Sequence, residues 1–367
     1  MAVREDRGGH PSSRLLNAET AGSALRLNPQ QAASALVAGH LAILPTETVY
    51  GLAADARQPA TVARVFQVKG RPTDHPVIVH VGSAAAIADW SANTPDVAWK
   101  LAETFWPGPL TIVVPAAASV SRVLTGGQDT IALRCPAQQQ FLEVLDHMSR
   151  RQGLASAVAA PSANRFGQVS PTTAADALRG LRSRLSADDV VLDGGACQIG
   201  VESTVVDCTA RPIRILRPGR IGRRQLAEVL GWDAVAAVGT GTSTTAADES
   251  EEQVRVPGTL PSHYAPITPV SVVDAATLSA YGRHPNTTDR VIGLIAPASV
   301  ATPVGLHRIG SPANSRDYAH GLYSWFRRAD DLGCSELLVA LPLDPVDDPL
   351  ADAVADRVRR ATHPPTT

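Results

Sequence analysis

Between residues 28 and 230 the chain alternates short apolar runs with segments of helical periodicity, and this alternation limits the folds that it can adopt. The first helix is predicted to begin at Pro29, after an Asn28 N-cap, and to end before Gly39. An apolar strand at 41–44 follows it. Helices that alternate with strands indicate an α/β structure in layers.

The same reasoning predicts the other elements of this part of the chain. Helices are expected near 60–68, 95–104, 138–147 and 223–230, with one more from about Thr172, and strands at 76–81, 110–114, 130–134, 155–160, 189–192, 203–207 and 213–216. The later strands come without intervening helices, so the sheet should be twisted and mixed rather than wholly parallel.

Composition divides the chain into four parts. Residues 1–24 are predicted to be a loose tail, 25–235 a first α/β domain, 236–268 a linker and 269–361 a smaller, Rossmann-like α/β domain. The linker begins as a small, polar and acidic run and continues as a proline-rich segment that should be extended. The last part should have strands near 269–273, 291–295 and 336–341, with helices at 315–332 and 348–361.

Charge and cysteine usage narrow the class of protein. A net charge of −2 and a pI of about 6.6 argue against a protein that is permanently coated with nucleic acid, so any RNA contact should be local or weak. The cysteines have no zinc-ligand spacing, which favours free thiols in a reducing compartment. They are Cys135, Cys197, Cys208 and Cys334. No apolar run approaches the roughly 18 residues of a membrane span, and the polar N-terminus lacks a signal-peptide pattern. These features favour the cytoplasm.

Several common nucleotide-site motifs are absent. The only two lysines, Lys69 and Lys100, are not part of a phosphate-binding loop of the GxxxxGK type. Because arginine serves almost everywhere else, a retained lysine suggests a need for a compact ammonium group. There is also no dinucleotide fingerprint between a strand and a helix, no GxSxG, no HExxH and no kinase signature.

Four polar clusters at strand or helix ends remain as candidates for chemistry. Residues 45–52 (PTETVYGL) could line a small polar pocket or cap a helix. In 69–76 (KGRPTDHP), Lys69 and Arg71 could satisfy the last carbonyls of a helix or bind a polyphosphate. Residues 159–172 (APSANRFGQVSPT from Ala160) could be an anion cradle or an ordinary turn. In 201–220, a polar pair precedes a strand and Arg217 ends another.

Taken in order, these stretches together with FWPGPLT and ILRPGRIG resemble the YrdC-like family of threonylcarbamoyl-AMP synthases over about residues 25–232. The HYAP segment and the second α/β part resemble the long, two-domain branch of that family. The resemblance implies an enzyme, a nucleotidyltransferase, that condenses L-threonine, bicarbonate and ATP to L-threonylcarbamoyladenylate and pyrophosphate. It implies a place in the threonylcarbamoyl-adenosine modification of tRNA, and downstream tRNA threonylcarbamoyl-transfer machinery as a partner.

The resemblance also implies roles for single residues. Lys69 and Arg71 are expected to be catalytic. The ATP site would comprise Lys69, Arg71, His75, Thr130, Ser162, Asn164, Ser170, Arg217 and Tyr264. The threonine site would comprise Thr48, His80, Arg134, Ala160 and Ser203. Tyr264 lies in the linker, which would act as a lid. Mg²⁺ is expected to arrive with ATP, and no metal site made by the protein is expected.

Two other functions stay open at this point. Domains of the YrdC type also suit binding of double-stranded RNA, which the near-neutral charge of this chain disfavours. A carbamoyltransferase domain of the same type is the second alternative, and dependence on carbamoyl phosphate would distinguish it from the synthase.

Overall fold

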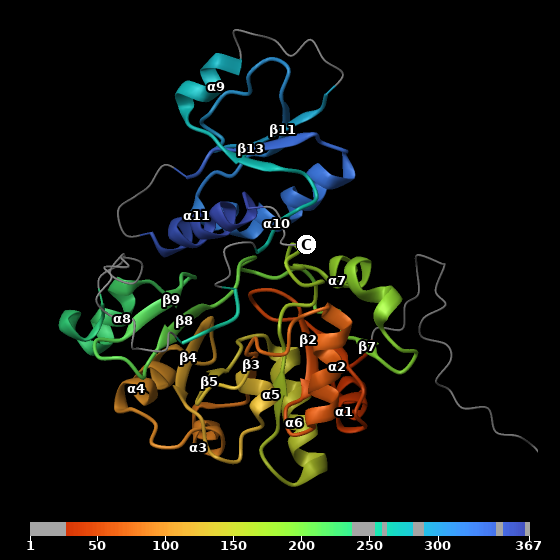
Figure 1. Cartoon of the computed structure of the whole chain (residues 1–367), viewed down its shortest axis with the longest axis vertical. Helices are drawn as coiled ribbons and strands as arrows, with labels where there is room; N and C mark the ends of the chain where they lie inside the picture. The colour runs from red at the N-terminus through yellow and green to blue at the C-terminus, as the bar shows by residue number, and fades with distance from the viewer. Residues whose placement is uncertain (1–26, 237–253, 259–262, 282–289, 343–347, 364–367) are drawn as a thin grey trace, which may run out of the picture.

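The computed structural model describes residues 27–236, 254–258, 263–281, 290–342 and 348–363, which form two α/β parts (Figure 1). The first part contains a nine-stranded sheet and the second a four-stranded sheet. The predicted tail at 1–24 and most of the predicted linker lie outside the described residues.

The first sheet is mixed, as predicted. Its strands are β1 (Ala42–Leu44), β2 (Gly51–Asp55), β3 (Ile78–Val81), β4 (Leu110–Pro115), β5 (Thr130–Arg134), β6 (Ala157–Ala159), β7 (Val190–Val191), β8 (Thr204–Asp207) and β9 (Arg214–Arg217). They lie in the order β7-β1-β2-β6-β3-β5-β4-β8-β9. The pairs β1–β7, β3–β5 and β4–β8 are parallel, and the other neighbours are antiparallel.

Helices cover both faces of this sheet. They are α1 (Pro29–Val37), α2 (Pro59–Lys69), α3 (Ile87–Trp90), α4 (Asp96–Phe105), α5 (Arg122–Thr125), α6 (Gln139–Gln152), α7 (Ala174–Leu181) and α8 (Arg223–Leu230), with 3-10 turns at Ala84–Ala86, Arg182–Arg184 and Trp232–Ala234. Leu36 of α1 and Phe141 of α6 pack in one core with Leu44, while Phe66 of α2 packs in another with Ile43. Adjacent residues of β1 therefore point to opposite cores, as the pleat of a strand requires.

One part of the sheet face on which α1 and α6 pack is covered by the segment 254–258 instead of a helix. Ile78, Ala132 and Val205, from three strands, form a small core with Val256 of the segment 254–258. The space next to this segment is where the polar clusters of the sequence come together.

The second part has a parallel sheet. Its strands β10 (Val270–Val272), β11 (Ile292–Ile295), β12 (His307–Gly310) and β13 (Glu336–Val339) lie in the order β10-β13-β11-β12. Its helices are α9 (Ala275–Tyr281), α10 (Ser315–Asp331) and α11 (Pro349–Ala361), and the last two lie between this sheet and the first domain (Figure 1). Phe326 of α10 and Val354 of α11 share a buried core with Val49 and Val201 of the first domain. The two domains are therefore packed together by apolar burial.

Five helices and strands were not predicted, and α6 is longer than expected. The sequence analysis missed β2, β12, α9 and the two four-residue helices α3 and α5. The strand β2 reads GLAAD, which lacks the β-branched and aromatic residues on which strand prediction depends. It forms because it lies between β1 and β6 with all five residues buried, so tertiary packing overrides its weak local preference.

Two other expectations concern the chain as a whole. All four cysteines are buried and free, as expected from their spacing. Within the described ranges no helix combines the length and the apolar character that a bilayer crossing needs.

Candidate active site

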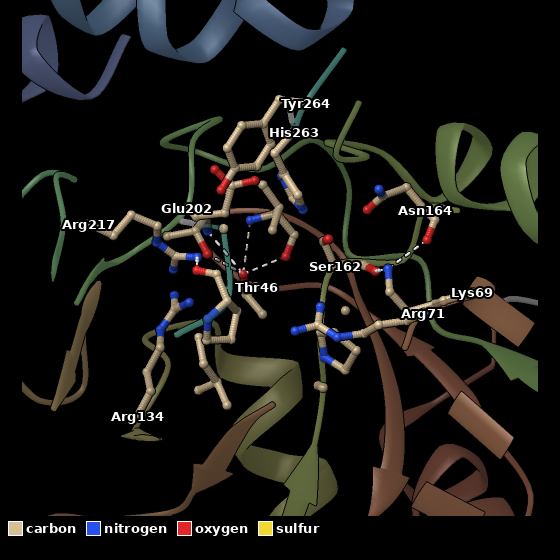
Figure 2. A pocket seen from close by; sticks show the side chains of 18 of the residues that line it. Thr46, Lys69, Arg71, Arg134, Ser162, Asn164, Glu202, Arg217, His263 and Tyr264 are labelled. Carbon is tan, nitrogen blue, oxygen red and sulfur yellow. Dashed lines mark hydrogen bonds between the residues drawn. The ribbon is translucent and has the colours of Figure 1, made fainter. Parts of the chain in front are cut away.

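A pocket lies on the sheet face beside the segment 254–258, and ten of the fourteen predicted site residues line it. These ten are Thr48, Lys69, Arg71, His80, Arg134, Ala160, Ser162, Asn164, Arg217 and Tyr264. In Figure 2 the guanidinium groups of Arg71, Arg134 and Arg217 point into the same space, and His263 and Tyr264 lie above it. Strand register explains part of this meeting, because His80 of β3 is paired with Arg134 of the parallel strand β5.

Lys69 holds the loop that contains Ser162 and Asn164 in place through hydrogen bonds. It is the last residue of α2, and its ammonium group donates to the carbonyl oxygens of Ser162 at 2.5 Å and Asn164 at 2.6 Å. It makes no bond to the carbonyls of its own helix, so the capping alternative for Lys69 is wrong. Burial, followed by the nearby charge of Arg71, holds the pKa of Lys69 well below its ordinary value. An anion in the pocket would favour the charged form.

Arg71 also lines the pocket and follows Lys69 by two residues, on the turn after α2. Its Nη2 donates to the carbonyl of Pro76 at 2.7 Å, and its guanidinium lies 5.9 Å from the centre of the Phe166 ring. Its buried Nε has no hydrogen-bond partner. Burial lowers the pKa of Arg71 to about 10, so its guanidinium is a poorly solvated charge. His75 packs edge-on against Phe166 and does not line the pocket.

Arg134 is held by a carboxylate that the sequence analysis did not assign to the site. Glu47 accepts from Arg134 Nη2 at 2.7 Å, and its second oxygen accepts from the amide of Ala137 at 3.1 Å. Arg134 Nε also donates to the carbonyl of Gly108 at 3.3 Å. Next to it, burial and the charge of Arg134 hold the pKa of His80 well below its ordinary value, so that imidazole is neutral. The guanidinium is therefore oriented before any ligand arrives.

Arg217 is held by Ser203 and by the linker segment. Its Nε and Nη2 donate to the carbonyl and the hydroxyl of Ser203, both at 3.0 Å, and its Nη1 donates to the carbonyl of Pro257 at 2.8 Å. Ser203 also shares a 2.8 Å hydrogen bond with Thr111 and is fully buried. Ser203 thus lies behind Arg217 and does not line the pocket itself.

Glu202 connects the pocket to the second domain. It accepts from Ser170 Oγ at 2.6 Å, from the Tyr323 hydroxyl at 2.9 Å and from Arg357 Nε at 3.0 Å. Burial alone would raise its pKa, but Arg357 and Arg217 outweigh burial and lower it to about 2. Ser170 is therefore committed to Glu202 and lies outside the pocket lining, as does Thr130 at the start of β5.

Four described residues of the linker close the pocket. They are Pro257, Gly258, His263 and Tyr264, while 259–262 lie outside the described residues. The Tyr264 ring stacks on Tyr323 of α10 at a centroid distance of 5.8 Å. Burial lowers the pKa of His263 to about 3, so its imidazole is neutral, and its Nδ1 has no partner.

The pocket has the electrostatics of a site for an anionic, polar ligand. Arg71, Arg134 and Arg217 line it, and only Glu202 opposes them among the carboxylates of the lining. Buried polar atoms without a partner occur in eight described residues, and five of these line the pocket. These five atoms are Arg71 Nε, His80 Nδ1, Asn164 Oδ1, His263 Nδ1 and Tyr264 Oη. Because buried polar groups are normally paired, this concentration points to a ligand that supplies the missing partners.

Metal binding by side chains alone has no basis in the described part of the chain. It contains no group of three or more histidine, cysteine, aspartate or glutamate residues placed to hold a metal ion. Glu202 is occupied by Arg357, and the nearby Glu47 by Arg134.

Several lining residues were not assigned to the site from the sequence. They are Thr46, Val49, Gly51, Ile78, Pro161, Phe166, Glu202, Pro257, Gly258 and His263. Most of them lie within the four polar clusters or the proline-rich segment. Glu202 could have been found, because it is a carboxylate directly before Ser203 at a strand end, whereas Ile78 gave no signal.

Two family models together match nearly all of the chain from residue 34 onward. The model described as "Telomere recombination", for Sua5, YciO and YrdC proteins, matches residues 34–219. The model of the threonylcarbamoyl-AMP synthase C-terminal domain matches residues 221–362. The chain belongs to the Sua5/YciO/YrdC family. Its second domain is the type found at the C-terminus of threonylcarbamoyl-AMP synthases.

Three relatives in sequence are named threonylcarbamoyl-AMP synthase, one of them as putative. The threonylcarbamoyl-AMP synthase of Pyrococcus abyssi is 40% identical over 64% of this chain and 65% of its own length. That of Bacillus subtilis is 36% identical over 67% of this chain and 66% of its own length. The putative threonylcarbamoyl-AMP synthase of Mycobacterium tuberculosis is 38% identical over 57% of this chain and 91% of its own length. The chain thus spans just under two thirds of the first two relatives in sequence.

Solved structures of Pyrococcus abyssi Sua5 extend the similarity to both domains. A complex with L-threonine has a TM-score of 0.76 and 31% identity, and covers 91% of this chain and 94% of its own. A variant in which an adjacent histidine and tyrosine are replaced by alanine has a TM-score of 0.75 and the same identity. The expected two-domain fold of the family is therefore confirmed.

Proposed function

We propose that this protein condenses L-threonine, bicarbonate and ATP to L-threonylcarbamoyladenylate and pyrophosphate. The observation that carries the proposal is the pocket, where buried cations and five unpartnered polar atoms face one space in a member of this family. Even without Lys69, the three guanidinium groups of Arg71, Arg134 and Arg217 outnumber the one carboxylate that lines the pocket, that of Glu202. Such a site suits a triphosphate and a carboxylate together.

The two substrates would occupy opposite sides of the pocket. ATP would lie against Arg71, the Lys69-bound loop with Ser162 and Asn164, and Arg217, with Tyr264 above it. Threonine would lie near Thr48, His80, Ala160 and Arg134, whose guanidinium suits a carboxylate. The similar structure of Pyrococcus abyssi Sua5 was solved as a complex with L-threonine, which supports threonine as a ligand. Four predicted ligands that do not line the pocket would support it indirectly: His75, Thr130, Ser170 and Ser203. They would do so through Phe166, strand β5, Glu202 and Arg217, respectively.

The proposed reaction needs alignment more than covalent catalysis. The amine of threonine attacks bicarbonate, and loss of water gives an N-carboxy carbamate. A carbamate oxygen then bonds to the α-phosphorus of ATP while the bond to the β-phosphate oxygen breaks and pyrophosphate leaves. Lys69, Arg71 and Arg217 would neutralise charge that develops on the phosphates, and the fixed pocket would hold the two reactants in line. Pro257, Gly258, His263 and Tyr264 would keep water from the labile products.

Mg²⁺ would enter with ATP as part of that substrate. The carboxylates near the pocket are paired with arginines, so phosphate oxygens and water would supply its ligands. The adenylate would pass to the machinery that modifies tRNA, which would place the protein in the cytoplasm.

The direct test is pyrophosphate release with each substrate omitted in turn. We expect release only with ATP, threonine and bicarbonate together, and slower release with serine, because a missing methyl costs about 1–3 kcal/mol in an apolar subsite. Release that depends on carbamoyl phosphate would favour the carbamoyltransferase alternative. Salt-dependent RNA binding without ATP turnover would favour the RNA-binding alternative.

A further inference from the structure

A buried arginine of the second domain reaches the back of the pocket. Arg357 lies on α11 and is fully buried. Its Nε donates to Glu202 at 3.0 Å, and its Nη1 donates to the carbonyl of Pro218 at 2.8 Å. Its guanidinium also lies over the Tyr264 ring, 5.3 Å from the centre. One side chain of the second domain thus contacts three separate segments beside the pocket.

Two of these contacts are made to residues adjacent in sequence to Ser203 and Arg217, which are hydrogen-bonded to each other. Glu202 directly precedes Ser203, whose carbonyl and hydroxyl hold the Arg217 guanidinium. Pro218 directly follows Arg217 on the chain. Arg357 therefore holds the side chain of the residue before Ser203, the acceptor, and the backbone carbonyl of the residue after Arg217, the donor.

The third contact holds a residue in an unfavourable backbone conformation. Tyr264 has a φ of +65°, which is uncommon for a residue other than glycine and persists only where the surroundings impose it. Its ring contacts both Arg357 and Tyr323, which belong to the second domain. The next residue, Ala265, donates its amide to the carbonyl of Gly167 at 3.1 Å, which ties this segment to the first domain.

From these contacts we infer that Arg357 is a positioning residue of the active site, by which the packed second domain holds both Arg217 and Tyr264 against the ligand. What the site binds rests on the proposed function. The arrangement itself does not, because it concerns only contacts between the two domains.

The test uses the full chain and three variants. Arg357→Lys keeps the charge but loses the planar group that meets Glu202, Pro218 and the ring together. Glu202→Gln with Arg357→Met removes both charges and avoids an unpaired buried one. Arg179→Gln is the control, because its exposed ion pair with Asp331 also joins the domains but lies apart from this network. Hydrogen exchange of the Ala265 amide, ATP affinity by calorimetry and the unfolding temperature are measured for each.

We expect both Arg357 variants to speed exchange of the Ala265 amide at least about tenfold and to weaken ATP binding about tenfold or more, with core strand amides unchanged. Arg179→Gln should leave all three readouts near wild type. Unchanged Ala265 exchange and ATP affinity in both Arg357 variants would overturn the inference, and so would uniform loss of protection across the molecule. If the wild type binds no ATP, the proposed function fails, while the exchange comparison still decides the role of Arg357.

Discussion

Lys69 and Lys100 are the only lysines of the chain, and because their surroundings differ, Lys100 can serve as a control for Lys69. Lys69 is buried and donates to the carbonyls of Ser162 and Asn164, whereas Lys100 is exposed on α4. The sequence offered helix capping or phosphate binding for Lys69. The structure adds a third role, because the ammonium also holds the loop that carries two further candidate ATP ligands.

Lys69→Ala should therefore affect both activity and stability. Loss of the ammonium leaves two buried carbonyls without their donor, which costs about 1–3 kcal/mol in the free energy of unfolding. Turnover should fall by about 100-fold or more, since a fixed cation near the phosphates is also lost. Pyrophosphate release and thermal unfolding check both effects, with Lys100→Ala expected to match the wild type. A lower melting temperature with near-normal turnover would show that Lys69 is purely structural.

At the scale of elements, Gly258 shows how closely the linker segment fits the pocket. It has a φ of +85°, and a Cβ there would lie 2.2 Å from the Tyr264 hydroxyl oxygen and 3.0 Å from Arg217 Nη1. Only glycine allows both the conformation and the approach of these side chains.

Gly258→Ala should displace Tyr264 and weaken substrate binding. We expect the KM for ATP to rise about tenfold or more, beyond the backbone strain common to any such substitution. Gly231→Ala is the matched control, because Gly231 has a φ of +87° but nothing lies within 4 Å of its added Cβ. Steady-state kinetics of the two variants separate the effect of the steric clash with Tyr264 and Arg217 from the effect of backbone strain at a positive φ. Equal KM values would mean that the Tyr264 position does not matter for ATP.

Elements with strong local signals could be predicted, and those set by packing could not. Asn28 caps α1 with Gln31 in a reciprocal pair, and its prediction holds to within a residue. By contrast β2 depends on its neighbours in the sheet. The same division applies to the site. The four polar clusters lead to ten lining residues, but Glu47 and Glu202 owe their roles to arginines 87 and 155 residues away in the chain.

At the scale of the whole molecule, the two domains share a buried ion pair between Glu202 and Arg357. Glu202 has a pKa of about 2 in the folded protein against an ordinary value of 4.5. Its folded pKa is depressed, so its contribution to stability is present above pH 4.5 and is lost as the pH falls toward 2. In that window the unfolded chain binds the proton and the folded chain does not.

The resulting loss in the free energy of unfolding between pH 5 and pH 3 should be about 2 kcal/mol from this group. Glu202→Gln cannot titrate, so its stability should fall less steeply over the same range. Denaturant unfolding of both proteins at pH 3, 4 and 5 makes the comparison. Parallel curves for the two proteins would mean that Glu202 is not held ionised by Arg357 and Arg217.

The central claim is that bicarbonate, threonine and ATP are joined in one pocket, and the product itself tests it most directly. The full-length protein is incubated with ATP, threonine, Mg²⁺ and bicarbonate labelled with carbon-13. The products are then separated rapidly, and their masses are measured by mass spectrometry. The account predicts a threonylcarbamoyladenylate that is heavier by the single labelled carbon and absent when any one substrate is omitted. Pyrophosphate release without a labelled adenylate, or an adenylate that lacks the label, would contradict it.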